Sequence, residues 1–147
     1  MKVNMKFRKM YEDVQLPKFD ATVGAGSDIY AYIKEDVVIP PHTTVLINTG
    51  FQTSFKDEYV ALVYSRSGMA VKRNLVIAQG TAVIDSSYRG EWMIPLHNDS
   101  NEPKTVSPGE RICQFILAPV FDIDIEEVDS LDETERGSGG FGSTGVN

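Results

Sequence analysis

The sequence predicts one all-β domain, arranged as a sandwich or barrel. Short runs of strand-forming residues recur along the chain, and turn formers stand between them. A length of 147 residues with 41% apolar content is enough to bury one core without disulfides. The 12 glycines and 7 prolines favour many turns over long helices. This composition excludes a coiled coil, a collagen helix and a fully disordered chain.

The first strand is predicted where Val3, Met5 and Phe7 alternate with polar residues. Turn formers such as Pro40-Pro41 separate the later segments. Residues 67–73 are the one stretch expected to form a helical turn or two. The other predicted β segments span residues 44–53, 59–64, 75–77, 81–84, 91–96 and 111–117.

The formal net charge of −7 argues against a nucleic-acid binder, because a phosphate backbone requires a basic surface. Much of that charge lies in residues 122–135, which hold eight acidic residues and no Lys or Arg. The rest of the chain, with 14 basic and 13 acidic residues, is nearly neutral. We expect this stretch to be a strand tail that continues into a solvated tether.

The C-terminal segment differs in composition from everything before it. Residues 136–147 contain five glycines and only two sizeable apolar side chains, Phe141 and Val146, so they cannot pack a core of their own. The expected organisation is a β domain over residues 1–121, an acidic tether over 122–135 and a Gly-rich arm over 136–147.

The sequence contains no sign of a membrane span or an export signal. The longest apolar stretch, residues 115–121, is far below the roughly 20 residues that a span needs. The N-terminus lacks an apolar signal-peptide core, and the single Cys113 cannot form a disulfide framework. We therefore expect a cytoplasmic chain without a membrane partner.

Ser65-Arg66-Ser67-Gly68 follows an apolar strand and precedes the expected helical turn. The Ser67 hydroxyl and the nearby backbone N–H groups could therefore meet an anion at a helix N-terminus. The alternative is a helix N-cap with a structural arginine.

Asp85 directly follows the apolar segment 81–84, and a strand end can hold a base rigidly beside a ligand. An ordinary turn aspartate is the alternative. Tyr88 adds a flat ring that could pack on a sugar, or it could be a half-buried tyrosine at a strand end.

Arg111 and Gln114 are three residues apart near the start of a strong strand, so an extended chain would point them to opposite faces. Further on, Arg136 and Ser143 flank glycines whose N–H groups could form an anion-binding nest around Phe141. Disorder is the alternative for this arm.

Metal-binding and P-loop motifs are absent from the sequence. It contains no CxxC, HExxH or GxxxxGK[ST] spacing, so a protein-caged zinc site and a P-loop NTPase are not expected. Any divalent ion is expected to be held mainly by a phosphate ligand.

Five segments, taken in order, resemble the five motifs of the trimeric dUTPase family, the deoxyuridine 5′-triphosphate nucleotidohydrolases. The similarity extends from about residue 21 to the C-terminus, and its last, Gly-rich match is the most specific. The segments are Ala25-Gly26-Ser27-Asp28, Arg66-Ser67-Gly68-Met69-Ala70, residues 80–91 with Asp85 and Tyr88, residues 109–114 with Arg111 and Gln114, and residues 136–145.

The resemblance implies a jelly-roll-like β subunit of the β-clip type, assembled as a homotrimer with an exchanged C-terminal arm. Each active site would take motifs one, two and four from one chain, motif three from a second and the arm from a third. A closed three-fold ring suits a tail that cannot bury itself on its own chain.

The resemblance also implies the reaction: dUTP and water give dUMP and pyrophosphate by attack at the α-phosphorus. Asp85 would be the base for the water, and Mg²⁺ would be held mainly by the phosphates and by water. Asp28 and Arg111 would orient the site. The implied phosphate ligands are Arg66, Ser67, Gly68 and Gln114, with Arg136 and Ser143 closing over the γ-phosphate. Gly142 is also implied to bind the substrate.

Nucleotide selection is implied to come from the same hairpin as Asp85. Backbone groups around Gln79, Val83 and Ile84 would read the uracil edge, and the Tyr88 ring would exclude a 2′-hydroxyl. Met93 would border the nucleotide, and Phe141 would cover the uracil.

Some positions depart from the family pattern, and two other functions stay open. Ser87 replaces a common Asp, which leaves the hydrogen bonding near the base undetermined, and Gln79 replaces a familiar Asn. One alternative is a dCTP deaminase, although Glu91 lies too early for the glutamate of that family. The other is a nucleotide-switched protein that binds a protein partner.

Overall fold

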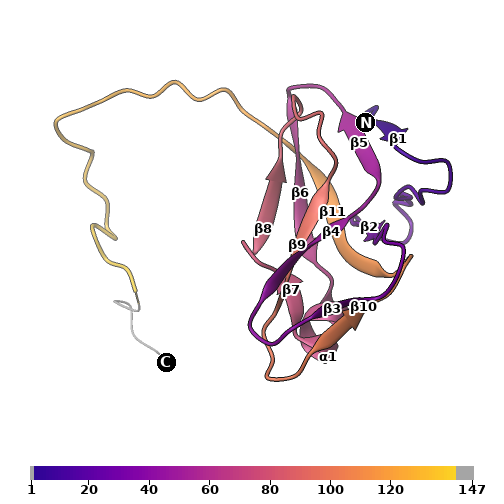
Figure 1. Cartoon of the computed structure of the whole chain (residues 1–147). Coiled ribbons are helices and arrows are strands. Elements are labelled where there is room, and N and C mark those ends of the chain that lie inside the picture. Colours follow the sequence, from indigo (N-terminus) through magenta and orange to yellow (C-terminus); the bar gives the residue numbers. More distant parts are fainter. Residues whose placement is uncertain (1, 142–147) are drawn as a thin grey trace.

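The computed structural model describes residues 2–141 and confirms the predicted all-β fold (Figure 1). The described chain forms antiparallel strands and one short helix, α1 (Ser67–Arg73). The strands are β1 (Lys6–Lys9), β2 (Ser27–Tyr30), β3 (Val37–Ile39), β4 (Thr44–Asn48), β5 (Phe51–Ser54), β6 (Tyr59–Ser65), β7 (Leu75–Ile77), β8 (Thr81–Ile84), β9 (Met93–Asn98), β10 (Lys104–Val106) and β11 (Arg111–Pro119).

Two main sheets and two strand pairs make up the body. The four-stranded sheet has the order β2-β11-β6-β8, and the three-stranded sheet has the order β4-β9-β7. Strand β1 pairs with β5, and β10 pairs with β3. Neighbours in these sheets are mostly far apart in sequence, so the fold depends on long-range pairing.

An aromatic cluster lies at the centre of the core. The Trp92 ring lies 5.4 Å from Phe51 and 5.3 Å from Phe115, measured between ring centroids. Its indole N–H donates to the Thr53 hydroxyl at 3.0 Å, so this buried polar group is satisfied. The cluster joins β5 and β11 through the segment that precedes β9.

Several predicted elements have different bounds in the structure. The segment 44–53 is two strands, because the chain turns at residues 49–50. The first strand begins at Lys6 rather than near Val3. The short strands β2, β3 and β10 were not predicted, since β2 begins with the turn formers Ser-Asp and the other two are flanked by prolines.

A β-bulge near the start of β11 makes one sequence expectation wrong. The register of β11 against β2 shifts between Arg111 and Cys113, so Ile112 is an extra residue and both Ile112 and Cys113 are buried. Arg111 and Gln114 consequently lie on the same face as Asp28, not on opposite faces. The bulge brings motif four to motif one.

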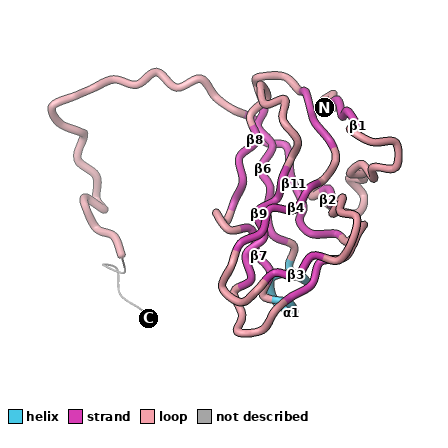
Figure 2. The backbone as a smooth tube through the Cα atoms, in the orientation of Figure 1, coloured by secondary structure: helices cyan, strands magenta, loops and turns pink. Residues whose placement is uncertain are grey.

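After β11 the described chain leaves the body without forming another strand or helix before residue 141 (Figure 2). Residues 120–138 are all exposed. The apolar side chains of Phe121, Ile123 and Ile125 alternate with acidic ones, which is the pattern of a strand with one covered face. Over residues 2–141, no helix is long and apolar enough to cross a bilayer.

Candidate functional site

Asp28 on β2 is the centre of a charged cluster. One carboxylate oxygen accepts from Arg66 Nε at 2.8 Å, and the other lies 3.2 Å from Arg111 Nη1. The Asp28 and Arg66 side chains are about three-quarters buried. Because two guanidinium groups share one carboxylate, the cluster keeps a net positive charge that can attract an anion.

Gln114 lies beside this cluster on β11. Its Nε2 donates to the Ser65 carbonyl at 3.3 Å. A Cβ at Gly26 would lie 2.6 Å from Gln114 Oε1, so glycine is required there for the amide to keep its position. The sequence motifs one and four are therefore packed against each other.

Helix α1 begins directly after Arg66. The Arg66 backbone is extended, and its carbonyl accepts from the N–H groups of Met69 and Ala70 at 3.0 Å. The N–H groups of Ser67 and Gly68 lie in the first turn, where a helix offers them no acceptor. The alternative interpretation is the one observed, because Arg66 is the N-cap and forms a structural ion pair with Asp28, whereas anion binding at Ser67 stays a prediction.

Arg73 fixes the other end of α1, a role that the sequence did not suggest. Its guanidinium forms an ion pair with Glu110 and donates to the Thr105 carbonyl. The second Glu110 oxygen accepts from the Ser107 N–H at 3.1 Å. Glu110 belongs to motif four, which is the sequence signal that could have singled it out. Nothing in the sequence indicates that its partner is Arg73.

Asp85 follows β8 at the edge of the four-stranded sheet. It opens a turn in which the Tyr88 N–H donates to the Asp85 carbonyl at 3.1 Å. Its side chain is exposed, and no group among residues 2–141 forms a hydrogen bond or ion pair with the carboxylate. The carboxylate is thus available to a ligand or to water.

The other predicted residues of this hairpin occupy β7–β9 and their turns. Gln79 lies in the turn before β8, Val83 is 61% exposed on β8, and Ile84 pairs with Ala61. Met93, 45% exposed, begins β9.

Within one chain, Asp85 and Arg66 lie at opposite ends of β6. Ile84 pairs with Ala61, which places Asp85 beside Val60, six residues before Arg66. At about 3.3 Å per residue, the two are about 20 Å apart along the strand. A general base must be within hydrogen-bond reach of its water, so one chain alone cannot bring both groups to one phosphate.

The described arm residues, Arg136 and Phe141, form no hydrogen bond or ion pair with the described part of the body. Arg136 Nε donates to the Gly139 carbonyl at 3.0 Å within a local turn, and Phe141 is fully exposed. Gly142 and Ser143 lie outside the described residues.

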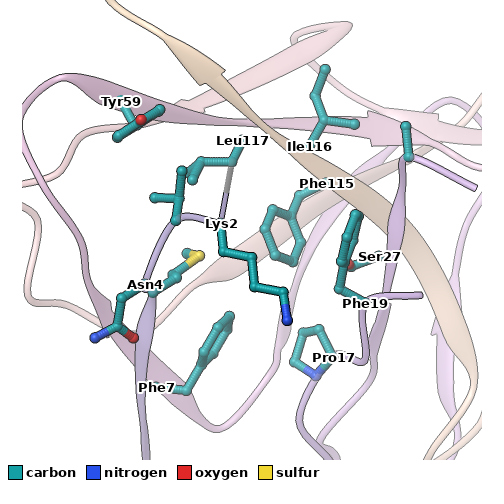
Figure 3. Close-up of a pocket in the computed structure, with 13 residues that line it drawn as sticks. Lys2, Asn4, Phe7, Pro17, Phe19, Ser27, Tyr59, Phe115, Ile116 and Leu117 are labelled. Atoms are coloured by element: carbon teal, nitrogen blue, oxygen red, sulfur yellow. The ribbon is translucent and has the colours of Figure 1, made fainter. Parts of the chain in front are cut away.

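None of the predicted site residues lines the apolar cavity of about 820 Å³, although Ala25 and Ser27 of motif one do (Figure 3). Phe7, Phe115 and Leu117 line it, with Lys2 at its side. A phosphate ligand needs several cationic or N–H donors, which this apolar lining does not supply. The candidate site is therefore the Asp28 cluster and not this cavity.

The electrostatic environment of Cys113, on the buried side of β11, differs from that of the charged cluster. Burial raises the pKa of the Cys113 thiol, and the Asp28 charge raises it further, while Arg66 partly offsets these effects. Cys113 is thus a neutral core residue, as expected from its apolar strand. Residues 2–141 contain no group of three His, Cys, Asp or Glu side chains that could hold a metal ion.

The dUTPase family model matches residues 12–145. The chain belongs to the dUTPase family. The deoxyuridine 5′-triphosphate nucleotidohydrolase of Finegoldia magna is 42% identical over 88% of this chain and 91% of its own length. That of Clostridioides difficile is 42% identical over 97% of this chain and 98% of its own.

Solved dUTPases have the same fold as this family member. The G164S mutant of the Staphylococcus bacteriophage 80alpha dUTPase, with dUpNHpp, has a TM-score of 0.84 and 28% identity, covering 97% of this chain and 99% of its own. Another 80alpha structure, with a TM-score of 0.82, was described in work on phage dUTPases that control transfer of virulence genes by a proto-oncogenic G protein-like mechanism. The jelly-roll-like dUTPase fold expected from the sequence is confirmed.

Proposed function

We propose that this chain hydrolyses dUTP to dUMP and pyrophosphate. The observation that carries the proposal is its similarity, over nearly the whole length, to enzymes named for this reaction. The charged cluster of motifs one, two and four supports it, since it is built to receive an anion.

Arg66 and Gln114 bind the phosphates in this proposal. Arg66 is held by Asp28 through its Nε and by the Arg111 carbonyl, which lies 3.5 Å from its Nη1, so Nη2 is left for a phosphate oxygen. The Ser67 and Gly68 N–H groups at the start of α1 face the same ligand. A Cβ at Gly68 would have no atom within 4 Å, so this glycine leaves room there for a phosphate group.

Asp85 is the proposed general base for the water that attacks the α-phosphorus. The Asp85 carboxylate is exposed and has no hydrogen-bond or ion-pair partner among residues 2–141, so it is free to accept a proton from water. Gln114 lies near the α-phosphate in this arrangement.

Mg²⁺ is the proposed cofactor, held by the substrate phosphates and by water. The cluster offers guanidinium and amide donors to a phosphate, and the described residues contain no group of three or more His, Cys, Asp or Glu side chains that could hold a metal ion. The ion supplies charge neutralisation on the triphosphate. The residues of the chain position that triphosphate.

A homotrimer with shared active sites is the assembly we propose. It brings Asp85 of one subunit to the Arg66 and Gln114 of another, which the separation of about 20 Å along β6 prevents within one chain. The alternating apolar residues at 121–125 suit a segment that is covered by a neighbouring subunit.

The arm closes the site in this proposal. Arg136 binds the γ-phosphate as an arginine finger, together with Gly142 and Ser143, and Phe141 covers the uracil. Support comes from Phe141, because its aromatic side chain is fully exposed and no group among residues 2–141 covers it.

The hairpin of β8 selects the nucleotide. Backbone groups of Gln79, Val83 and Ile84 read the uracil edge, and Met93 borders the base. Tyr88 packs on the deoxyribose and rejects a 2′-hydroxyl. Such an enzyme acts in the cytoplasm, or in the cytoplasm of the host if the gene is viral. It limits uracil incorporation into DNA and supplies dUMP for dTMP synthesis.

Two other functions remain as alternatives to be tested. A dCTP deaminase is disfavoured because both Glu91 carboxylate oxygens are occupied by the turn at Asn48, Thr49 and Gly50. Nucleotide-switched binding of a protein partner is favoured only by the description of the phage relative and adds to hydrolysis rather than replacing it.

The deciding experiment measures pyrophosphate and ammonia release from dUTP, dTTP, UTP and dCTP with Mg²⁺ present. Fast pyrophosphate release from dUTP alone is expected. Ammonia from dCTP would overturn the proposal in favour of a deaminase. A pull-down with and without a nonhydrolysable dUTP analogue tests the protein-partner alternative.

A further inference from the structure

Tyr88 is held against its own chain by an unusually close fit. Its hydroxyl donates to the Glu91 carbonyl at 3.0 Å. A Cβ at Gly90 would lie 2.2 Å from that hydroxyl oxygen and 2.4 Å from Cζ. No side chain fits there, so the phenol end of the ring occupies the space that a side chain at residue 90 would take.

Glu91 connects this ring to the rigid body. Its carboxylate accepts from the N–H groups of Thr49 and Gly50, at 3.2 and 2.7 Å, and from the Asn48 amide at 2.9 Å. Gly50 has φ +72° and lies where a Cβ would be 2.6 Å from Val14, so this turn is closely packed as well.

Arg89 holds the backbone of the turn that carries Tyr88. Its Nη1 donates to the carbonyls of Ser86 and Tyr88 at 2.6 and 3.0 Å and lies 3.4 Å from the Thr53 carbonyl. Tyr88 is therefore fixed both at its backbone and at its hydroxyl. The ring is still 42% exposed, which leaves surface for a ligand.

We propose that Gly90 is a specificity-determining positioning residue, which acts through the placement of the Tyr88 ring to reject ribonucleotides. The inference rests on the proposed function and deepens it. A ring that is free to move away from the sugar would make room for a 2′-hydroxyl, whereas a ring fixed at both ends cannot. An apolar surface rejects an added hydroxyl by about a hundredfold at most, so fixing the ring is needed to reach that limit.

The test compares kcat/KM for dUTP and for UTP in the wild-type chain, Gly90→Ala and Gly24→Ala. Gly24 is the matched control, because a Cβ there would have no atom within 4 Å. We expect Gly90→Ala to lower the dUTP to UTP ratio by about tenfold or more, mainly through a better KM for UTP. Gly24→Ala should leave the ratio unchanged. General damage to the fold would lower both activities together without changing their ratio.

A double-mutant cycle shows whether Gly90 acts through the ring. In a Tyr88→Ala background, Gly90→Ala should change the ratio no further, since the ring that it displaces is gone. A further change there, or an unchanged ratio in the single variant, overturns the inference. If Gly90→Ala does not fold, the Tyr88→Phe variant provides the test. It removes only the hydrogen bond to the Glu91 carbonyl, so it should lower the dUTP to UTP ratio by less than the change expected for Gly90→Ala. An unchanged ratio in Tyr88→Phe would then overturn the inference.

Failure of the inference can be distinguished from failure of the proposed function. If the wild-type chain releases no pyrophosphate from dUTP, the proposed function fails and takes this inference with it. If the wild-type chain is active and selective but the variants keep its selectivity, only the inference fails.

Discussion

Asp28 and Arg136 belong to two regions of this chain that differ in what holds them. Asp28 on β2 forms ion pairs with Arg111 at the start of β11 and with Arg66, which directly follows β6. Among residues 2–141, Arg136 bonds only within its own turn, in a segment where residues 120–138 are all exposed. Asp85 resembles the second region, because its carboxylate has no partner among the described residues.

The difference separates residues that are preorganised, that is, held in place within one chain, from residues that need a ligand or another subunit to hold them. Substitution of a residue in the preorganised region should affect both stability and binding, because buried ion pairs support the fold. Substitution of a residue in the other region should affect turnover alone, because no tertiary contact among the described residues is lost. Four predictions test this distinction.

Asp85→Asn should have the largest effect. We expect kcat to fall by about a thousandfold, because the amide keeps the shape of the side chain and loses the base. Affinity for a nonhydrolysable dUTP analogue and the melting temperature should stay near wild type. Single-turnover kinetics and calorimetry measure these quantities, and near-normal turnover would refute the role of Asp85.

Deletion of residues 136–147 should have the next largest effect. We expect kcat/KM for dUTP to fall by about a hundredfold, since the proposed finger and cover are lost together. The melting temperature and the subunit number from light scattering should not change. Dissociation of the assembly would show that this segment belongs to the folded core instead.

Asp28→Asn is the matched counterpart of Asp85→Asn in the preorganised region. The same chemical change leaves two guanidinium groups without a counter-charge, so the free energy of unfolding should fall by about 1 kcal/mol after allowance for partial exposure. KM for dUTP should also rise. Urea unfolding and initial rates measure both, and wild-type stability in this variant would remove the distinction between the regions.

The smallest expected effect is the pH dependence of stability that comes from Cys113, on the buried side of β11. Burial raises the pKa of the folded thiol, so thiolate forms first in the unfolded chain. Its stabilising contribution is complete below about pH 8.5 and is lost as pH rises, by about 0.8 kcal/mol at pH 9. Urea unfolding should show the advantage of wild type over Cys113→Ala shrinking between pH 8 and 9.5. A constant difference would contradict the assignment.

Local patterns predicted much of the fold and the chemistry of the site. The helix at residues 67–73 and the strands around 59–64, 81–84 and 111–117 follow from periodicity and turn formers, which are properties of neighbouring residues. The strands β2, β3 and β10 lie among turn-forming residues and carry no such local signal. They form by pairing with distant segments, β2 with β11 and β3 with β10.

Residue types and their order along the chain determined the all-β class, the candidate residues and the family, because these depend on chemistry that each residue carries with it. Only the tertiary structure decided where those residues lie. The bulge at Ile112 turned Arg111 toward the face of Gln114, and the register of β6 with β8 placed Asp85 at the far end from Arg66. Both result from pairing between distant strands, whose alignment is set by the packing of the whole sheet and not by the local sequence.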